Sequence, residues 1–157
     1  MKLIAHRGLY NGPDKELENS PDQIIDALSR GYDCEVDLWI INSEMWLGHD
    51  GPEYYIQPKF LFDNATGLWI HAKNLAALRW LTDQPDLVYF THNKDECTLT
   101  SNNLIWTYPG KDLTMKSIML MPEWADPDLK NVHKRCYGIC SDYVAEIKEI
   151  LFPSTKL

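Results

Sequence analysis

The chain has 157 residues, of which 45% are hydrophobic and 24% charged, and its formal net charge is −8. This length suits one domain with a single core, so we expect one domain over residues 1–157. The acidic balance speaks against nucleic acid as a partner, because nucleic-acid-binding domains carry a basic surface, and no apolar run is long enough for stable insertion into a membrane.

The cysteine pattern favours reduced thiols. With only five residues ahead of His6, the sequence as it stands has no room for a secretory leader, so we expect a cytoplasmic protein. The four cysteines form no CxxC pair, and in that setting they are interpreted as structural thiols. They are Cys34, Cys97, Cys136 and Cys140.

The first third of the chain predicts three strands and one helix. Ser20 can cap a helix, Pro21 suits its first position and Gly31 suits its exit, so residues 21–30 are expected to be helical. Short apolar runs on either side are typical of strands. These runs are Lys2–Ala5, Cys34–Ile40 and Met45–Gly48.

The middle of the chain continues the alternation of strand and helix. Asn74 can cap a helix that runs to about Leu81. The connections at 93–103 and 108–116 look too short or too broken for a regular helix. The strands expected here are Leu68–Ala72 and Leu87–Thr91.

The last third predicts three further strands and a terminal helix. Ser141 can cap that helix, which carries Val144, Ile147 and Leu151 on one face. The strands are Leu104–Thr107, Ser117–Met121 and Cys136–Cys140.

Eight strands alternating with helices favour a parallel α/β architecture. Right-handed crossovers would close such a sheet into a barrel, which usually takes about 250 residues. We therefore expect a compact TIM-type (β/α)8 barrel with several helices reduced or missing. An open α/β sheet of fewer strands is the alternative.

Titratable residues follow the expected strand ends, where parallel α/β folds collect their functional groups. Glu35 and Asp37 lie two apart in one strand, so their side chains share a face, and a divalent cation would relieve their repulsion. A solvated outer strand face is the simpler alternative. The other residues of the expected rim are His6, Arg7, His49, Asp50, His71, Lys73, His92, Tyr108, Glu123 and Asp142.

Further pairs suggest phosphate chemistry. His71 and Lys73 would also point together, and Lys73 could meet either a phosphate or one of the two carboxylates. His6 and His49 come from different strands, as expected for a proton donor and a proton acceptor. Arg7 offers a fork for a phosphate, although a salt bridge to Glu18 is an equally simple role.

Four motifs in the first fifty residues resemble the glycerophosphodiester phosphodiesterase family. They are His6-Arg7-Gly8, Glu18-Asn19-Ser20, Glu35-x-Asp37 and His49-Asp50, in the order of that family. The resemblance implies a TIM barrel in which Glu35 and Asp37 bind Mg2+ or Ca2+. It also implies that His6 and His49 act as acid and base and that Arg7 holds the phosphate.

The chain departs from the family at its next motif. The family has an acid two residues before a lysine, whereas this chain has His71 before Lys73. His71 would then be a nitrogen ligand, or Glu123 would supply an oxygen from another strand. The segment after His49 is also shorter than in the family.

Together these features predict a metal-dependent phosphodiesterase acting on a small phosphodiester, glycerophosphodiester-like or with a related head group. A weakened phosphodiester- or sugar-phosphate-binding module is one alternative. A partner-dependent subunit or oligomer is another, since a short barrel would expose apolar edges. Most large aromatic residues should belong to the core, although some could form a platform for a head group: Trp39, Trp46, Trp69, Trp106 and Tyr108.

Overall fold

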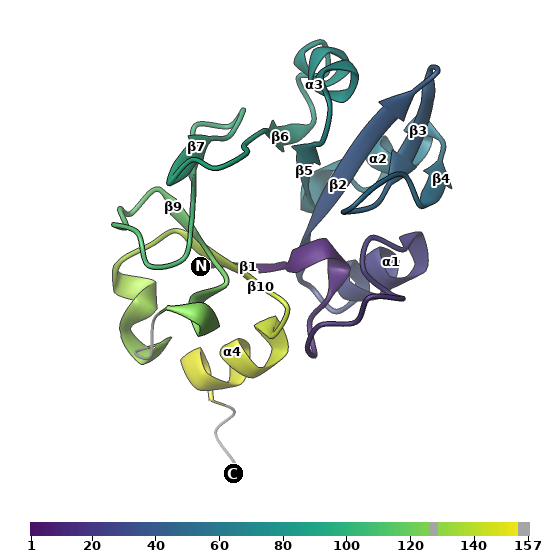
Figure 1. Ribbon diagram of the computed structural model, residues 1–157. Helices are drawn as coiled ribbons and strands as arrows, with labels where there is room; N and C mark the ends of the chain where they lie inside the picture. Colours follow the sequence, from purple (N-terminus) through teal and green to yellow (C-terminus); the bar gives the residue numbers. More distant parts are fainter. Residues whose placement is uncertain (126–128, 154–157) are drawn as a thin grey trace.

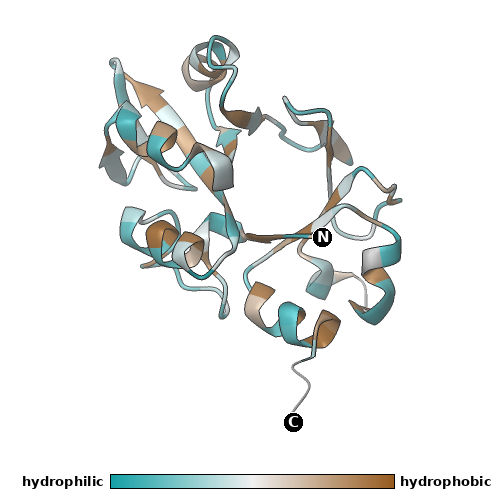
Figure 2. Cartoon of the chain, turned by 180° about the vertical axis from the view of Figure 1, so that it is seen from behind, coloured by the Kyte–Doolittle hydropathy of each residue, from teal (hydrophilic) through white to brown (hydrophobic). Residues whose placement is uncertain are grey.

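A computed structural model describes residues 1–125 and 129–153, without the side chain of His133. In this part of the chain one mixed sheet of ten strands curls into a half-barrel, accompanied by four short helices (Figures 1 and 2). The strands are β1 (Lys2–Ala5), β2 (Asp33–Ile41), β3 (Glu44–Leu47), β4 (Tyr54–Ile56), β5 (Leu68–Ala72), β6 (Val88–Phe90), β7 (Cys97–Leu99), β8 (Ile105–Thr107), β9 (Ser117–Leu120) and β10 (Gly138–Ser141). The helices are α1 (Pro21–Ser29), α2 (Pro58–Asp63), α3 (Leu75–Thr82) and α4 (Val144–Leu151).

Seven of the strands run parallel, in the order β6-β5-β2-β1-β10-β9-β8. The antiparallel strands β3 and β4 extend from β2, and β7 pairs antiparallel with β8. Two hydrogen bonds join Tyr89 of β6 to Ser101 in the loop after β7. Ser101 N donates to Tyr89 O over 2.8 Å, and Tyr89 N donates to Ser101 Oγ over 3.0 Å. The parallel strands therefore direct their carboxyl ends to one rim.

The expected TIM-type (β/α)8 barrel is wrong. The run at Met45–Gly48 forms β3, which returns antiparallel to β2 instead of following a crossover helix. The turn between them has positive φ at Asn42 (52°) and Ser43 (68°), as in the tight turns that match the twist of a hairpin. The described residues thus form strands and short loops in place of eight helical crossovers.

The individual elements agree better with the sequence. All eight predicted runs contain strands, and the capped helices form as α1 and α3, with Ser20 Oγ accepting from Gln23 N and Asn74 Oδ1 from Ala77 N. Three elements were not predicted: β4, β7 and α2. The predicted cap of α4 is wrong, because Ser141 ends β10 and the helix begins after Tyr143.

The inside of the curl is filled by apolar side chains from six strands. Each parallel strand turns alternate residues inward, so these side chains stack into a floor below the rim. Outside, α1, α2 and α3 pack against the other face of β2 and β5 through residues such as Ile24, Leu61 and Leu81. No helix of the described residues is long and apolar enough to cross a membrane. The floor consists of Ile4, Trp69, Phe90, Trp106, Ile118, Leu120, Met121 and Cys140.

Candidate functional site

Two neighbouring parallel strands place the predicted acids and bases above this floor. In β2 and β5, Asp37 is in register with His71 and Glu35 with Trp69, so the inward faces of both strands meet. Glu35 is 3% exposed, Asp37 1% and His71 8%. Ionisable groups buried this deeply need partners, because an unpaired charge in the interior is costly.

Asp37 is the centre of the hydrogen-bond network. One oxygen accepts from Asn19 Nδ2 (3.0 Å) and His49 Nδ1 (3.2 Å), and the other from His71 Nδ1 (2.9 Å), with Lys73 Nζ at 3.4 Å. Burial alone would raise the pKa of Asp37, but the hydrogen bonds from His49 and His71 and the charge of Lys73 hold it well below its usual value. Asp37 is therefore a carboxylate anchored by four groups.

Glu35 is in the opposite situation. Burial, followed by the negative charge of Asp37, raises the pKa of Glu35, and its carboxylate accepts from the backbone N of Arg7 over 3.1 Å. Ligand atoms of Glu35, Asp37 and His71 lie within 4.8 Å of one another. Two carboxylates and an imidazole fit a divalent cation, and a cation would offset the repulsion between the two acids. Among the described residues no other such group is present.

Arg7 is held in a strained conformation beside the carboxylates. Its backbone is left-handed (φ 54°), which is uncommon for a residue other than glycine. Its guanidinium donates to Glu18 Oε2 over 2.7 Å, so the simple salt bridge is present. Among the described residues, Arg7 Nε is the one buried side-chain polar atom without a hydrogen-bond partner, and it lies 3.5 Å from Asp37 Oδ2. Arg7 Nε is thus ion-paired with Asp37 without making a hydrogen bond.

His6 is paired with an acid from the adjacent strand. At the carboxyl ends of β1 and β10, His6 Nδ1 lies 2.9 Å from Asp142 Oδ1. Burial lowers the pKa of His6, yet the hydrogen bond to Asp142 and the charge of Glu35 outweigh it, so the net shift is upward. The sequence places Asp142 on the rim but does not reveal this pairing.

A pocket of about 140 Å³ brings most of the predicted site together. Six of the seven predicted site residues line it, and the seventh, Lys73, approaches from a neighbouring hollow to 3.5 Å from His49 Nδ1. Glu123, the alternative metal ligand, accepts instead from Ser141 Oγ over 2.7 Å and does not belong to the group that could hold a metal. The pocket is lined by His6, Arg7, Glu35, Asp37, His49, His71, Phe90, His92, Trp106, Tyr108, Leu120, Met121 and Trp124.

Other contacts of this arrangement were not predicted, although His92 and Tyr108 were expected on the rim. Asn19, left-handed at φ 62°, both donates to the Asp37 carboxylate and accepts from the Asp37 backbone N. His92 stacks on His71 with 4.6 Å between ring centroids, and the Tyr108 hydroxyl is hydrogen-bonded to His92 Nδ1 over 3.1 Å. Burial and the nearby His71 lower the pKa of His92 to about 4. The Glu18-Asn19 motif was the available signal for Asn19.

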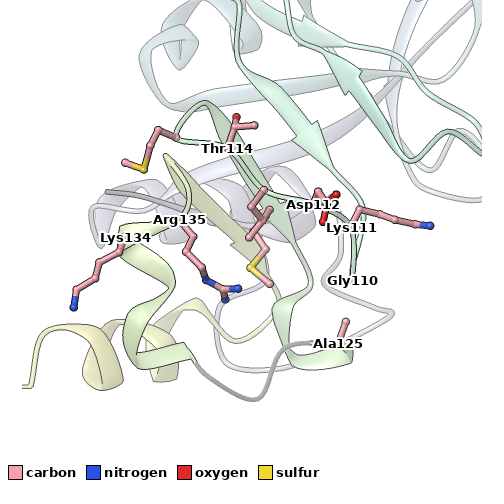
Figure 3. A pocket seen from close by; sticks show the side chains of 10 residues that line it. Gly110, Lys111, Asp112, Thr114, Ala125, Lys134 and Arg135 are labelled. Atoms are coloured by element: carbon pink, nitrogen blue, oxygen red, sulfur yellow. The ribbon is translucent and has the colours of Figure 1, made fainter.

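A larger hollow, of about 730 Å³, has a different character (Figure 3). Lys111, Lys134 and Arg135 border it together with Asp112 and Thr114. Lys111 is already paired with Glu96 over 2.6 Å, and the described residues of the lining include no histidine. Those residues therefore offer no acid–base pair comparable to the one around Asp37.

Comparisons with protein-family models, curated proteins and solved structures find no match to this chain. The candidate function consequently rests on the motifs and on the geometry of the pocket.

Proposed function

We propose that the protein is a metal-dependent phosphodiesterase acting on a small phosphodiester, of the glycerophosphodiester type or with a related head group. The observation that carries the proposal is the Glu35–Asp37–His71 group in the same pocket as His6 and His49. A pure binding site would need neither two buried acids nor two histidines of different environment.

In this proposal Glu35, Asp37 and His71 would hold the cation. Bound there, the cation would neutralise negative charge on a non-bridging phosphate oxygen. Arg7, whose Nε is ion-paired with Asp37, and Lys73 add positive charge beside Asp37. The network from Asn19 and the histidines fixes the Asp37 carboxylate, so the site requires little rearrangement to receive an anion.

The two histidines are assigned different proton-transfer roles. His6 is the acid, because the Asp142 carboxylate stabilises its charged form, and it protonates the leaving oxygen as the P–O bond breaks. His49 donates a hydrogen bond from Nδ1 to Asp37, so its Nε2 is free of a proton. Nε2 can then accept a proton from the attacking hydroxyl as the new P–O bond forms. Attack by water gives a phosphomonoester, whereas attack by a neighbouring substrate hydroxyl gives a cyclic phosphate.

We also place this reaction in the cytoplasm. All four cysteines are free, and burial raises the pKa of the Cys34, Cys136 and Cys140 thiols, so these three remain protonated and unreactive. A reducing compartment suits such thiols. Cell fractionation with an antibody against the chain tests this location.

The enzymatic proposal is tested by product release from a panel of phosphodiesters with Mg2+ or Ca2+. Cation-dependent turnover that is lost in His6→Ala and His49→Ala supports it. A folded protein that binds the cation but turns over no member supports a binding module instead.

A further inference from the structure

The pocket has two walls of different chemistry. One carries the acids, histidines and Arg7 described above. The other wall comes from β6, β8, the end of β9 and a short 3-10 helix, η3 (Pro122–Trp124). Its side chains are apolar or aromatic, and all except Trp124 also belong to the floor of the curl: Phe90, Trp106, Leu120, Met121 and Trp124.

This second wall offers little to a polyol. Among the thirteen described lining residues Tyr108 has the one hydroxyl group, and that hydroxyl already lies 3.1 Å from His92 Nδ1. On this wall the indole N–H groups of Trp106 and Trp124 are the remaining donors, so a glycerol hydroxyl placed here would regain few of the hydrogen bonds that it makes with water, which is costly. The wall favours an apolar group instead.

The aromatic rings of the wall are continuous with the proposed metal group. Phe90 stacks on Trp106 with 4.4 Å between centroids, and on His71 with 5.1 Å. Phe90 and Trp106 are 2% and 1% exposed, so packing fixes both rings. A ring attached to a phosphate at Asp37 would therefore meet a rigid aromatic surface.

Trp124 extends this surface to solvent and is 70% exposed. The backbone that carries it is held in place: Met121 is left-handed (φ 43°), Trp124 N donates to Met121 O over 3.0 Å, and the neighbouring Glu123 accepts from Ser141 Oγ. A ligand that covers a large exposed apolar side chain at the edge of a pocket removes apolar surface from water, and this burial favours binding.

The size of the pocket limits the group. Its volume is about 140 Å³, less than the cavity of about 150 Å³ that accommodates one benzene molecule in another protein, and it must also receive the cation and the phosphate, so the ester group is only partly enclosed and extends toward the exposed Trp124. We propose that the phosphate of the substrate carries one small planar or apolar group, such as an aryl ester, that lies against Phe90, Trp106 and Trp124. This inference rests on the proposed function and replaces glycerol with an apolar group as the preferred ester.

The experiment compares two anions by calorimetry in the presence of Mg2+. Phenylphosphonate carries a ring and cannot be hydrolysed at its P–C bond, whereas glycerol 3-phosphate carries a polyol. We expect phenylphosphonate to bind about tenfold more tightly, and Trp124→Ala to remove most of that preference while glycerol 3-phosphate changes less than about twofold. Phe152→Ala, which removes another exposed ring (53%) outside this pocket, is the matched control and should change neither affinity.

The two proposals fail in different ways. If both anions bind equally well and Trp124→Ala changes neither affinity, the aromatic preference is overturned and the phosphodiesterase proposal stands. If neither anion binds to the folded protein, the proposed function is overturned and the inference falls with it. Circular dichroism establishes the fold of each variant.

Discussion

Replacing Asp142 by Asn tests the role assigned to His6. The amide oxygen can still accept from His6 Nδ1 at the present 2.9 Å, so the ring keeps its place, but the negative charge is lost. A hydrogen bond to a charged group contributes about 1.5–3 kcal/mol and one between neutral groups about 0.5–1.5 kcal/mol, so the variant loses about 1–1.5 kcal/mol, and 1.36 kcal/mol corresponds to one pKa unit. Both side chains are at most 14% exposed, so solvent screens this interaction little. We expect the pKa of His6 to fall by about one unit.

The sign of the effect follows from the direction of the shift. The pKa of His6 is raised in the folded protein, so the stability from this pair is fully present below the unfolded value of 6.5 and is lost as the pH rises through the folded value. If His6 is the acid, the alkaline limb of the kcat/KM profile moves to lower pH in Asp142→Asn by the same amount.

An NMR titration of the histidine ring protons, which needs no turnover, measures the His6 pKa alongside the rate profile. Asp63→Asn, the same change at an exposed carboxylate of α2, is the matched control and should leave the titration of His6 unchanged. An unaltered His6 pKa in Asp142→Asn would refute the assigned electrostatic coupling. A lowered pKa with an unmoved alkaline limb would refute the acid role alone.

Three further predictions concern the carboxylates and the loop that carries His49. A cation at 100 times its Kd should stabilise the protein by about 2.7 kcal/mol and raise the Tm by several degrees. Glu35→Gln should abolish this shift in Tm, and a shift that survives in this variant would mean that the cation binds elsewhere. Asp37→Ala leaves Lys73 and Arg7 beside an empty position and should cost about 3–5 kcal/mol in urea unfolding, so a loss below about 1 kcal/mol contradicts the network. Gly48→Ala should destabilise the protein by about 1–3 kcal/mol and impair turnover, because φ at Gly48 is 152° and a Cβ there would lie 2.1 Å from Gly51 O. Gly51→Ala is the control, since a Cβ at Gly51 meets nothing within 4 Å. Equal stability of the two variants would contradict the steric argument.

Local chemistry explains how much of the fold was predictable. Ser20 and Asn74 allow their helices to be predicted, because a capping side chain accepts a hydrogen bond from a backbone N–H only two or three residues away. The overall architecture was not accessible in this way. A run such as Met45–Gly48 has the same residue pattern whether it pairs parallel or antiparallel with its neighbour. The tight turn at Asn42 and Ser43 makes the pairing with β2 antiparallel.

The same distinction applies to the site. Glu35 and Asp37 share a face because strand residues alternate, which the sequence shows directly. By contrast, the pairing of His6 with Asp142 joins residues 136 positions apart and depends on β1 lying beside β10. Trp124 was missed because it follows the left-handed Met121, a conformation that the sequence around Pro122 does not indicate.

Turnover of a phosphodiester panel, with and without Mg2+ or Ca2+, tests the central claim most directly. The account predicts product release that requires the cation, disappears on chelation, and falls by orders of magnitude in His6→Ala and His49→Ala. A rate unaffected by chelation, or equal in the wild-type protein and both histidine variants, would contradict it.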